Sequence, residues 1–227
     1  MLSLTSRSRI TVLLAMAMIS GRIVDASAAE KTTLDFEKFE KGTLPTDFST
    51  ALTGGGGPVA WAIEEDSSSP SGPKVLAQTS ADSTDYRFPL CIYSPLPARD
   101  VGVAVRFKAV AGKVDQAAGL VVRFRDKDNY YVARANALED NVNLYKVVGG
   151  KRSRFAGSKI KVSSGVWHTL KLEVKGKRFE VSFDGQRLFE AEDGTFTEAG
   201  KVGLWTKADS VTYFDDLEIE PYDGQAS

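Results

Sequence analysis

The chain has 227 residues, a formal net charge of −1 and a single cysteine, Cys91. This charge balance is not that of a nucleic-acid-binding protein, and one cysteine excludes an intrachain disulfide. With only one histidine as well, zinc sites built from several histidines or cysteines are excluded.

The first 28 residues have the layout of a secretory signal peptide. Arg7 and Arg9 precede an apolar run over 10–19, and Ala26-Ser27-Ala28 provides small residues for cleavage. The run is too short to cross a bilayer, although an uncleaved anchor is the alternative. We therefore expect a secreted or periplasmic monomer with no membrane span, whose mature chain, residues 29–227, forms one domain.

From Leu34 onward the sequence reads as short strands. Apolar and polar residues alternate over 101–108, 170–175 and 179–183, and turn residues such as Gly149-Gly150 separate these segments. No segment keeps a helical period for three turns. The pattern predicts an all-β chain folded as a two-sheet antiparallel β-sandwich or jelly roll.

Residues 123–134, RFRDKDNYYVAR, predict a hairpin that turns at 126–129 and sets Arg125 opposite Tyr130. A second hairpin, centred on Gly149-Gly150, sets Tyr145 opposite Arg154. One face of each hairpin is apolar and predicts the core. The opposite faces together predict a basic and aromatic surface made of Arg123, Arg125, Tyr130, Arg134, Asn143, Tyr145 and Arg154.

Such a surface has the chemistry that a sugar requires. Guanidinium and amide groups hydrogen-bond to hydroxyls, aromatic rings stack on the C–H faces, and a sugar carboxylate would gain a charge-assisted bond. The alternative is a solvated sheet face whose arginines are balanced by carboxylates such as Asp126 and Asp128.

Histidine, cysteine and aspartate are the other residue types that offer candidate chemistry. His168, the one histidine, shares its strand face with Leu170 and Leu172, which favours a structural role, and Cys91 is expected to be a small buried residue. In the last strand, Asp215 shares an apolar face, where an unpaired carboxylate is costly. We therefore expect a structural Ca²⁺ held by Asp215 or its neighbour Asp216, together with oxygens of the first strand near Asp35, unless a bulge turns Asp215 outward.

Three stretches carry a resemblance to known proteins. GVWHTLKLEVKGKRFEVSFDG over 165–185 resembles the strand and turns of laminin-G-like and concanavalin-A-like lectin and glucanase sandwiches. GLVVRFRDKDNYY and KVGLWTKADSVTYFDDLEI are similar to a secreted bacterial branch related to glycoside hydrolase family sixteen and to 3-keto-disaccharide hydrolases.

The resemblance covers about residues 33–220 and implies a jelly roll whose concave sheet receives a glycan. The E-x-D-x-(x)-E strand of family-sixteen glucanases is missing here. The sequence therefore predicts a carbohydrate-binding sandwich. The alternatives are a glycan-cleaving hydrolase or lyase of the 3-keto-glycoside type, with catalytic residues unknown, and a protein-interaction module of the laminin-G kind.

Overall fold

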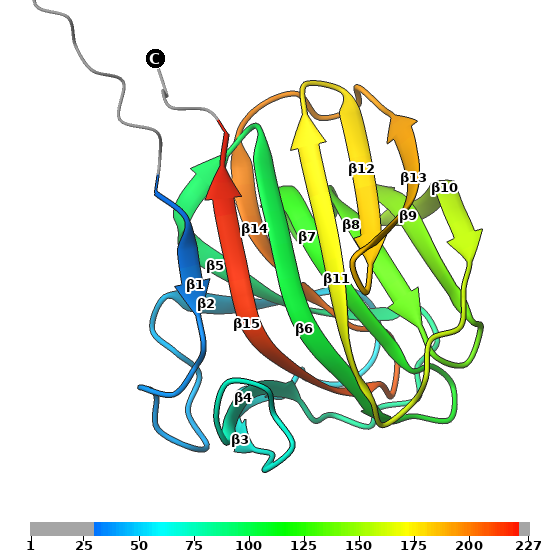
Figure 1. Ribbon diagram of the computed structural model, residues 1–227. Coiled ribbons are helices and arrows are strands. Elements are labelled where there is room, and N and C mark those ends of the chain that lie inside the picture. The colour runs from blue at the N-terminus through cyan, green and yellow to red at the C-terminus, as the bar shows by residue number, and fades with distance from the viewer. Residues whose placement is uncertain (1–29, 223–227) are drawn as a thin grey trace, which may run out of the picture.

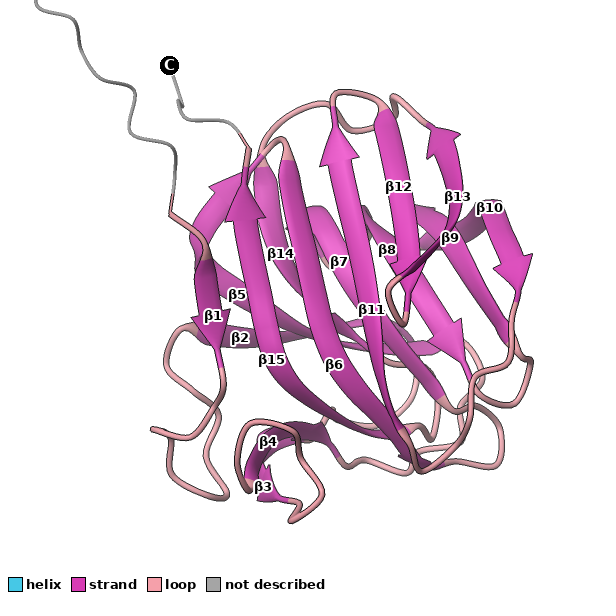
Figure 2. Ribbon diagram, viewed as in Figure 1, coloured by secondary structure: helices cyan, strands magenta, loops and turns pink. Residues whose placement is uncertain are grey.

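The computed structural model describes residues 30–222, so the expected signal peptide lies outside the described part. These residues form strands, turns and loops without any helix (Figure 2). Within them, accordingly, no helix has the length and hydropathy needed to span a bilayer. The strands build two antiparallel sheets packed face to face (Figure 1), which confirms the predicted β-sandwich.

Sheet A lies in front in Figure 1 and runs in the order β13-β12-β11-β6-β15-β4-β3, with β1 also pairing with β15. Its strands are β1 (Thr32–Leu34), β3 (Trp61–Glu65), β4 (Lys74–Gln78), β6 (Val101–Ala111), β11 (Trp167–Lys175), β12 (Arg178–Phe183), β13 (Gln186–Glu192) and β15 (Val211–Pro221). Because β1 pairs antiparallel with β15, the first and last strands are neighbours.

Sheet B lies behind sheet A and runs in the order β10-β9-β8-β7-β14-β5-β2. Its strands are β2 (Phe48–Gly54), β5 (Arg87–Ala98), β7 (Ala117–Asp126), β8 (Asn129–Asn136), β9 (Asn141–Val148), β10 (Lys151–Lys159) and β14 (Gly200–Trp205).

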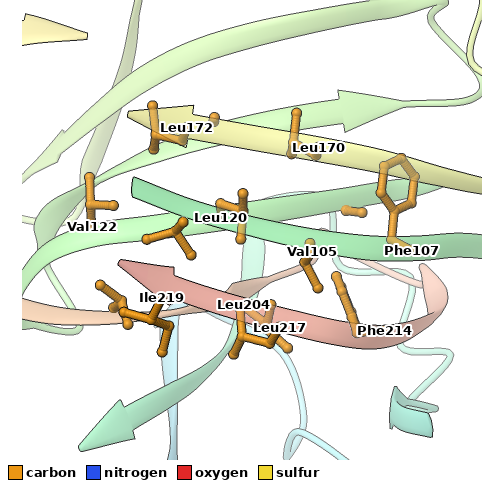
Figure 3. Packing of buried hydrophobic residues seen from close by; sticks show 14 of the residues in the cluster. Val105, Phe107, Leu120, Val122, Leu170, Leu172, Leu204, Phe214, Leu217 and Ile219 are labelled. Atoms are coloured by element: carbon orange, nitrogen blue, oxygen red, sulfur yellow. The ribbon is translucent and has the colours of Figure 1, made fainter. Parts of the chain in front are cut away.

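The main core fills the space between the two sheets. Figure 3 shows Val105, Leu170 and Leu217 of sheet A facing Leu120 and Leu204 of sheet B. All five are buried, as expected for alternating strands that each turn one face inward. The predicted apolar faces of β6, β11 and β12 are thereby confirmed.

Sheet B also carries apolar side chains on its other face, away from sheet A. The strand order places β10 and β5 far apart, yet side chains from the two ends of the sheet meet there. Tyr86, just before β5, donates a 3.0 Å hydrogen bond to the Gly150 carbonyl at the β9–β10 turn. Sheet B is therefore curled, and the inside of the curl holds a second apolar cluster. Its buried members are Phe88, Leu90, Ile92, Ala117, Val121, Tyr130, Val132, Tyr145, Val147 and Trp205.

A bulge in β7 overturns part of the predicted hairpin register. Val122 pairs with Tyr131 and Asp126 with Asn129, so β7 holds extra residues between these pairs. Arg123 adopts a left-handed backbone with φ 49°, which is uncommon for a residue with a side chain. The two faces of β7 are exchanged beyond this point.

A second bulge interrupts β15. The register shifts between Asp215 and Glu218, and Asp216 has a φ of 47°. Before the bulge Phe214 packs in the core, and after it Leu217 does. The prediction that Asp215 shares the core face was therefore wrong, because the bulge reverses the alternation of the strand.

Candidate functional site

The inside of the curl in sheet B contains a guanidinium surrounded by aromatic rings. Arg152, on β10, lies 4.6 Å from the ring centroids of both Phe88 and Tyr145, and 5.6 Å from that of Trp205. Phe88 and Trp205 are themselves stacked with centroids 5.2 Å apart. Each ring contact is attractive to a cation, so three strands hold the Arg152 side chain in place.

Tyr86 lies at the exposed edge of this group of rings. It is 45% exposed, and its ring meets Phe88 edge-on at 4.7 Å. Its phenol oxygen accepts a 2.8 Å hydrogen bond from the Arg152 amide, which complements the bond it donates to Gly150. We refer to Tyr86, Phe88, Tyr145, Arg152 and Trp205 as the Arg152 site.

A close backbone approach fixes the position of Tyr86. Gly54, at the end of β2, has φ +85°, and a side chain there would meet the Tyr86 carbonyl oxygen at 2.0 Å. Glycine is therefore required at this position for both conformation and space. The exposed tyrosine is thus held by the chain on both sides of the curl.

A polar group lies beside the Arg152 site. Arg134 is only 1% exposed, and it donates to Glu139 at 2.7 Å and to Asn141 at 2.6 Å. Asn143 donates to Asn141 and to the Tyr145 hydroxyl, which links this group to the ring-lined arginine. We call Arg134, Glu139, Asn141 and Asn143 the polar rim.

The electrostatics of the rim follow from these bonds. Burial alone would raise the pKa of Glu139, but the hydrogen bonds from Arg134 and Asn141 lower it to about 2. Glu139 is therefore ionised and pairs with Arg134. Lys207, nearby, is 2.9 Å from Asp115 and 2.5 Å from Asp85, so it too has carboxylate partners.

Several buried side-chain nitrogens and oxygens lack hydrogen-bond partners among the described residues. They include Arg134 Nε and Arg152 Nη1. A buried donor without an acceptor is costly, and native structures contain few. Two of them on neighbouring arginines mark this face as a place where further acceptors would be favourable.

Most predicted residues of the basic and aromatic surface do lie on the inside of the curl. Arg134, Asn143, Tyr145 and Arg154 share this face, and the predicted pairing of Tyr145 with Arg154 is confirmed. Tyr130 lies there too, but it is fully buried. Burial raises its pKa to about 12, and its hydroxyl bonds to Thr53 and Trp205, so it supports the surface from beneath.

The predicted position of Arg123 and Arg125 on this face was wrong. The bulge turns Arg123 into the interior, where it is fully buried and bonds to the carbonyls of Arg99, Phe196 and Gly176. Arg125 is exposed and lies 5.0 Å from the Phe196 ring, which belongs to the main core. Phe124 takes the inner position of the curl in their place.

The sequence reasoning missed four members of the Arg152 site. Arg152 shares its strand face with Arg154, so the alternation that identified one could have identified both. Tyr86, Phe88 and Trp205 come from distant segments, and only the curl brings them to β10.

His168 and Cys91, two further candidates from the sequence, lie among partners that hold the fold together. The His168 ring donates from Nδ1 to Asp184 at 2.7 Å while Nε2 accepts from the Ser163 amide, and rings of Phe107 and Phe183 flank it. These are the partners of a structural histidine, as predicted from the sequence. Cys91 is buried in the main core, and burial raises the pKa of its thiol, which disfavours the reactive thiolate.

Asp215 has hydrogen-bond donors beneath the β3–β4 loop. Its carboxylate accepts from the Ser69 hydroxyl and the Ser71 amide, while Asp216 accepts from the Ser71 hydroxyl and lies 3.3 Å from Arg106. Burial raises the pKa of Asp215. In residues 30–222 no group of three His, Cys, Asp or Glu side chains could hold a metal. Calcium binding by Asp215, Asp216 and Asp35 stays a prediction.

A hollow of about 290 Å³ on sheet A is a weaker candidate. It is lined by Glu173, Lys175, Arg178 and Glu180. Its charges are satisfied locally, since Glu173 pairs with Lys171 and Arg178 with Glu190. Exposed pairs of this kind are typical of a solvated sheet face.

Comparison by sequence relates the chain to a lectin domain and to a levanase. A family model described as the C-terminal lectin domain of galactocerebrosidase matches residues 57–222. The levanase of Bacillus subtilis (strain 168) is 34% identical over 89 residues, which is 38% of this chain and 13% of the levanase. The chain thus corresponds to a small part of that relative.

Solved structures share the fold. The carbohydrate-binding module CBM66 from Bacillus subtilis has a TM-score of 0.61 and 24% identity, covering 77% of this chain and 96% of that one. A β-glucanase from Bacillus licheniformis has a TM-score of 0.57 and 12% identity, covering 85% and 98%. The expected likeness to concanavalin-A-like lectin and glucanase sandwiches is confirmed at the level of the fold.

Proposed function

Because the chain belongs to the family of the galactocerebrosidase C-terminal lectin domain, we propose that it binds a carbohydrate on the inside of the curl in sheet B. The resemblance in the sequence implied a concave sheet as the receiving surface, and we assign that role to the Arg152 site and the polar rim. The levanase and the carbohydrate-binding module that it resembles support a glycan as the ligand.

The single observation that carries this proposal is the pairing of an exposed aromatic ring with hydrogen-bonding groups that are already in position. Tyr86 offers a ring face for the C–H surface of a sugar. Arg152 and the rim amides offer donors whose side chains are fixed by neighbours, so little conformational entropy is lost on binding.

Binding of the purified protein to a glycan array tests the proposal. Tyr86→Ala and Arg152→Ala should each weaken retention at least about tenfold, since each removes a contact worth on the order of 1–3 kcal/mol. Arg154→Ala is the matched control, because Arg154 is exposed on the same strand and the same face. Unchanged retention by a folded Tyr86→Ala, Arg152→Ala double variant would exclude this site.

The alternatives from the sequence, glycan cleavage and protein binding, are tested on the same preparation. Cleavage would produce new reducing ends from a retained glycan. A protein-interaction module would retain no glycan at all.

We also propose that the chain is exported, on the layout of its first 28 residues. Expression with the native N-terminus should place the protein outside the cytoplasm, and N-terminal sequencing should begin at Ala29. A cytoplasmic product that still begins at Met1 would contradict this.

A further inference from the structure

The inference concerns the ligand's charge and rests on the proposed function. Besides the exposed Arg154, three cations lie in or beside the inside of the curl, and two of these three have carboxylate partners. Arg134 pairs with Glu139, and Lys207 pairs with Asp85 and Asp115. Arg152 differs, because no carboxylate of residues 30–222 lies within ion-pair distance of its guanidinium, and its side chain makes no hydrogen bond with them.

The aromatic contacts of Arg152 do not use its donors. A guanidinium donates hydrogen bonds in its own plane, whereas attraction to rings acts through the ring faces. Phe88, Tyr145 and Trp205 therefore position the group without satisfying its N–H bonds, and Nη1 is buried without a partner. A half-buried cation is left with donors available and no counter-ion.

The surroundings of Arg152 also disfavour its positive charge. Burial lowers the pKa of Arg152 and the nearby Arg134 lowers it further, partly opposed by Tyr145 and Asp115. Exposed arginines on the chain, such as Arg154 and Arg125, are compensated by water. Arg152 has no such full hydration, so an external anion would gain more here than at those positions.

We propose that the ligand is an acidic glycan whose sugar carboxylate binds the Arg152 guanidinium while its ring packs on Tyr86. A carboxylate is planar and accepts two parallel N–H bonds from one guanidinium, which a neutral hydroxyl cannot do. Tyr86 is the neighbouring exposed ring, joined to Arg152 by the hydrogen bond from the Arg152 amide.

The test compares acidic oligosaccharides with their uncharged counterparts by calorimetry. The probes are oligomers of galacturonate and mannuronate and glucuronate-terminated oligosaccharides, each beside its carboxyl-reduced form, together with a sulfated galactan. For at least one pair, the acidic form should bind about tenfold or more tightly, and its affinity should fall as salt is raised. Arg152→Gln should bring the two forms to equal affinity, whereas Arg154→Gln should keep the difference.

Each contrary outcome has one meaning. Equal binding of acidic and reduced forms by the wild type would overturn the acidic ligand while leaving carbohydrate binding intact, as would binding of neutral glycans alone. Stronger binding of the sulfated galactan would overturn the carboxylate. Binding to none of the probes and to no glycan on the array would overturn both proposals. Because the wild-type comparison decides these cases, a failure of Arg152→Gln to fold would not prevent the test.

Discussion

The Arg123 guanidinium of β7 in sheet B donates a 2.6 Å hydrogen bond to the carbonyl of Gly176, in the β11–β12 turn of sheet A. It also donates to the Phe196 carbonyl and to Asp100 at 3.2 Å, and the Arg123 side chain itself is fully buried. One side chain thus joins the two sheets at this end of the sandwich.

We expect Arg123→Ala to lower the free energy of unfolding by about 3 kcal/mol or more, because it removes the donor to the Arg99, Phe196 and Gly176 carbonyls and one of the donors to Asp100. Urea denaturation measures the change. Arg125→Ala, two residues away and exposed, should change the value by less than about 0.5 kcal/mol. Equal effects of the two substitutions would contradict the structural role of Arg123.

The raised pKa of Tyr130 predicts that the folded protein loses stability in alkali. Its pKa is about 12 in the folded protein, against 10.0 when unperturbed, so the folded state holds the phenol proton more tightly. The associated stability is complete below pH 10 and is lost as the pH rises from 10 towards 12. Tyr130→Phe should have a shallower decline over this range in unfolding measurements. It should also cost about 1 kcal/mol at neutral pH through the lost bonds to Thr53 and Trp205. Identical alkaline profiles would refute the assignment.

The lowered pKa of Glu139 predicts that the folded protein loses stability in acid. Its folded pKa of about 2 lies below the unperturbed 4.5, so the unfolded state takes up the proton first. The stability from its pairing with Arg134 is present above pH 4.5 and is lost as the pH falls towards 2. The gain is moderated by solvent, because the Glu139 side chain is 48% exposed. Comparing acid unfolding of the wild type with Glu139→Gln isolates this contribution, and superimposable profiles would argue against it.

The proposed calcium site at Asp215, Asp216 and Asp35 predicts a metal-dependent melting temperature. A chelator should lower that temperature and added Ca²⁺ should restore it, as for any ligand that binds only the folded state. Asp215→Asn and Asp216→Asn identify the ligand, since only its variant should lose the response. The serine hydrogen bonds to Asp215 give a competing account. They predict that Asp215→Asn destabilises the protein, while the melting temperature of the wild type does not depend on calcium.

Alternation was a sound guide wherever a strand kept its register. The faces of β6 and β11 could be predicted because all paired residues from Val101 to Lys108 follow one unbroken register. It failed at Arg123 and Asp216, where a residue with a side chain adopts positive φ. Arginine rarely adopts this backbone, so nothing local indicated the bulge at Arg123, while aspartate tolerates it more readily and gives only a weak signal at Asp216.

The candidate site could be predicted only in part for a different reason. Arg134, Asn143 and Tyr145 lie on hairpins whose pairing is local, and their shared face follows from spacing. The approach of Phe88 and Trp205 to Arg152 depends on the curl of the whole sheet. Curvature arises from twist and bulges accumulated over several strands, and no single segment encodes it.

Because of the curl, the Arg152 site forms only when distant segments of the chain have come together. Its parts are Tyr86 and Phe88 before and within β5, Tyr145 and Arg152 on β9 and β10, and Trp205 on β14, so contacts between residues far apart in the chain must all be made. Such contacts are slow to form and are broken together on unfolding. A glycan bound there would slow amide exchange in β5 and β10 at once, and an isolated hairpin carrying Arg152 would have no affinity of its own.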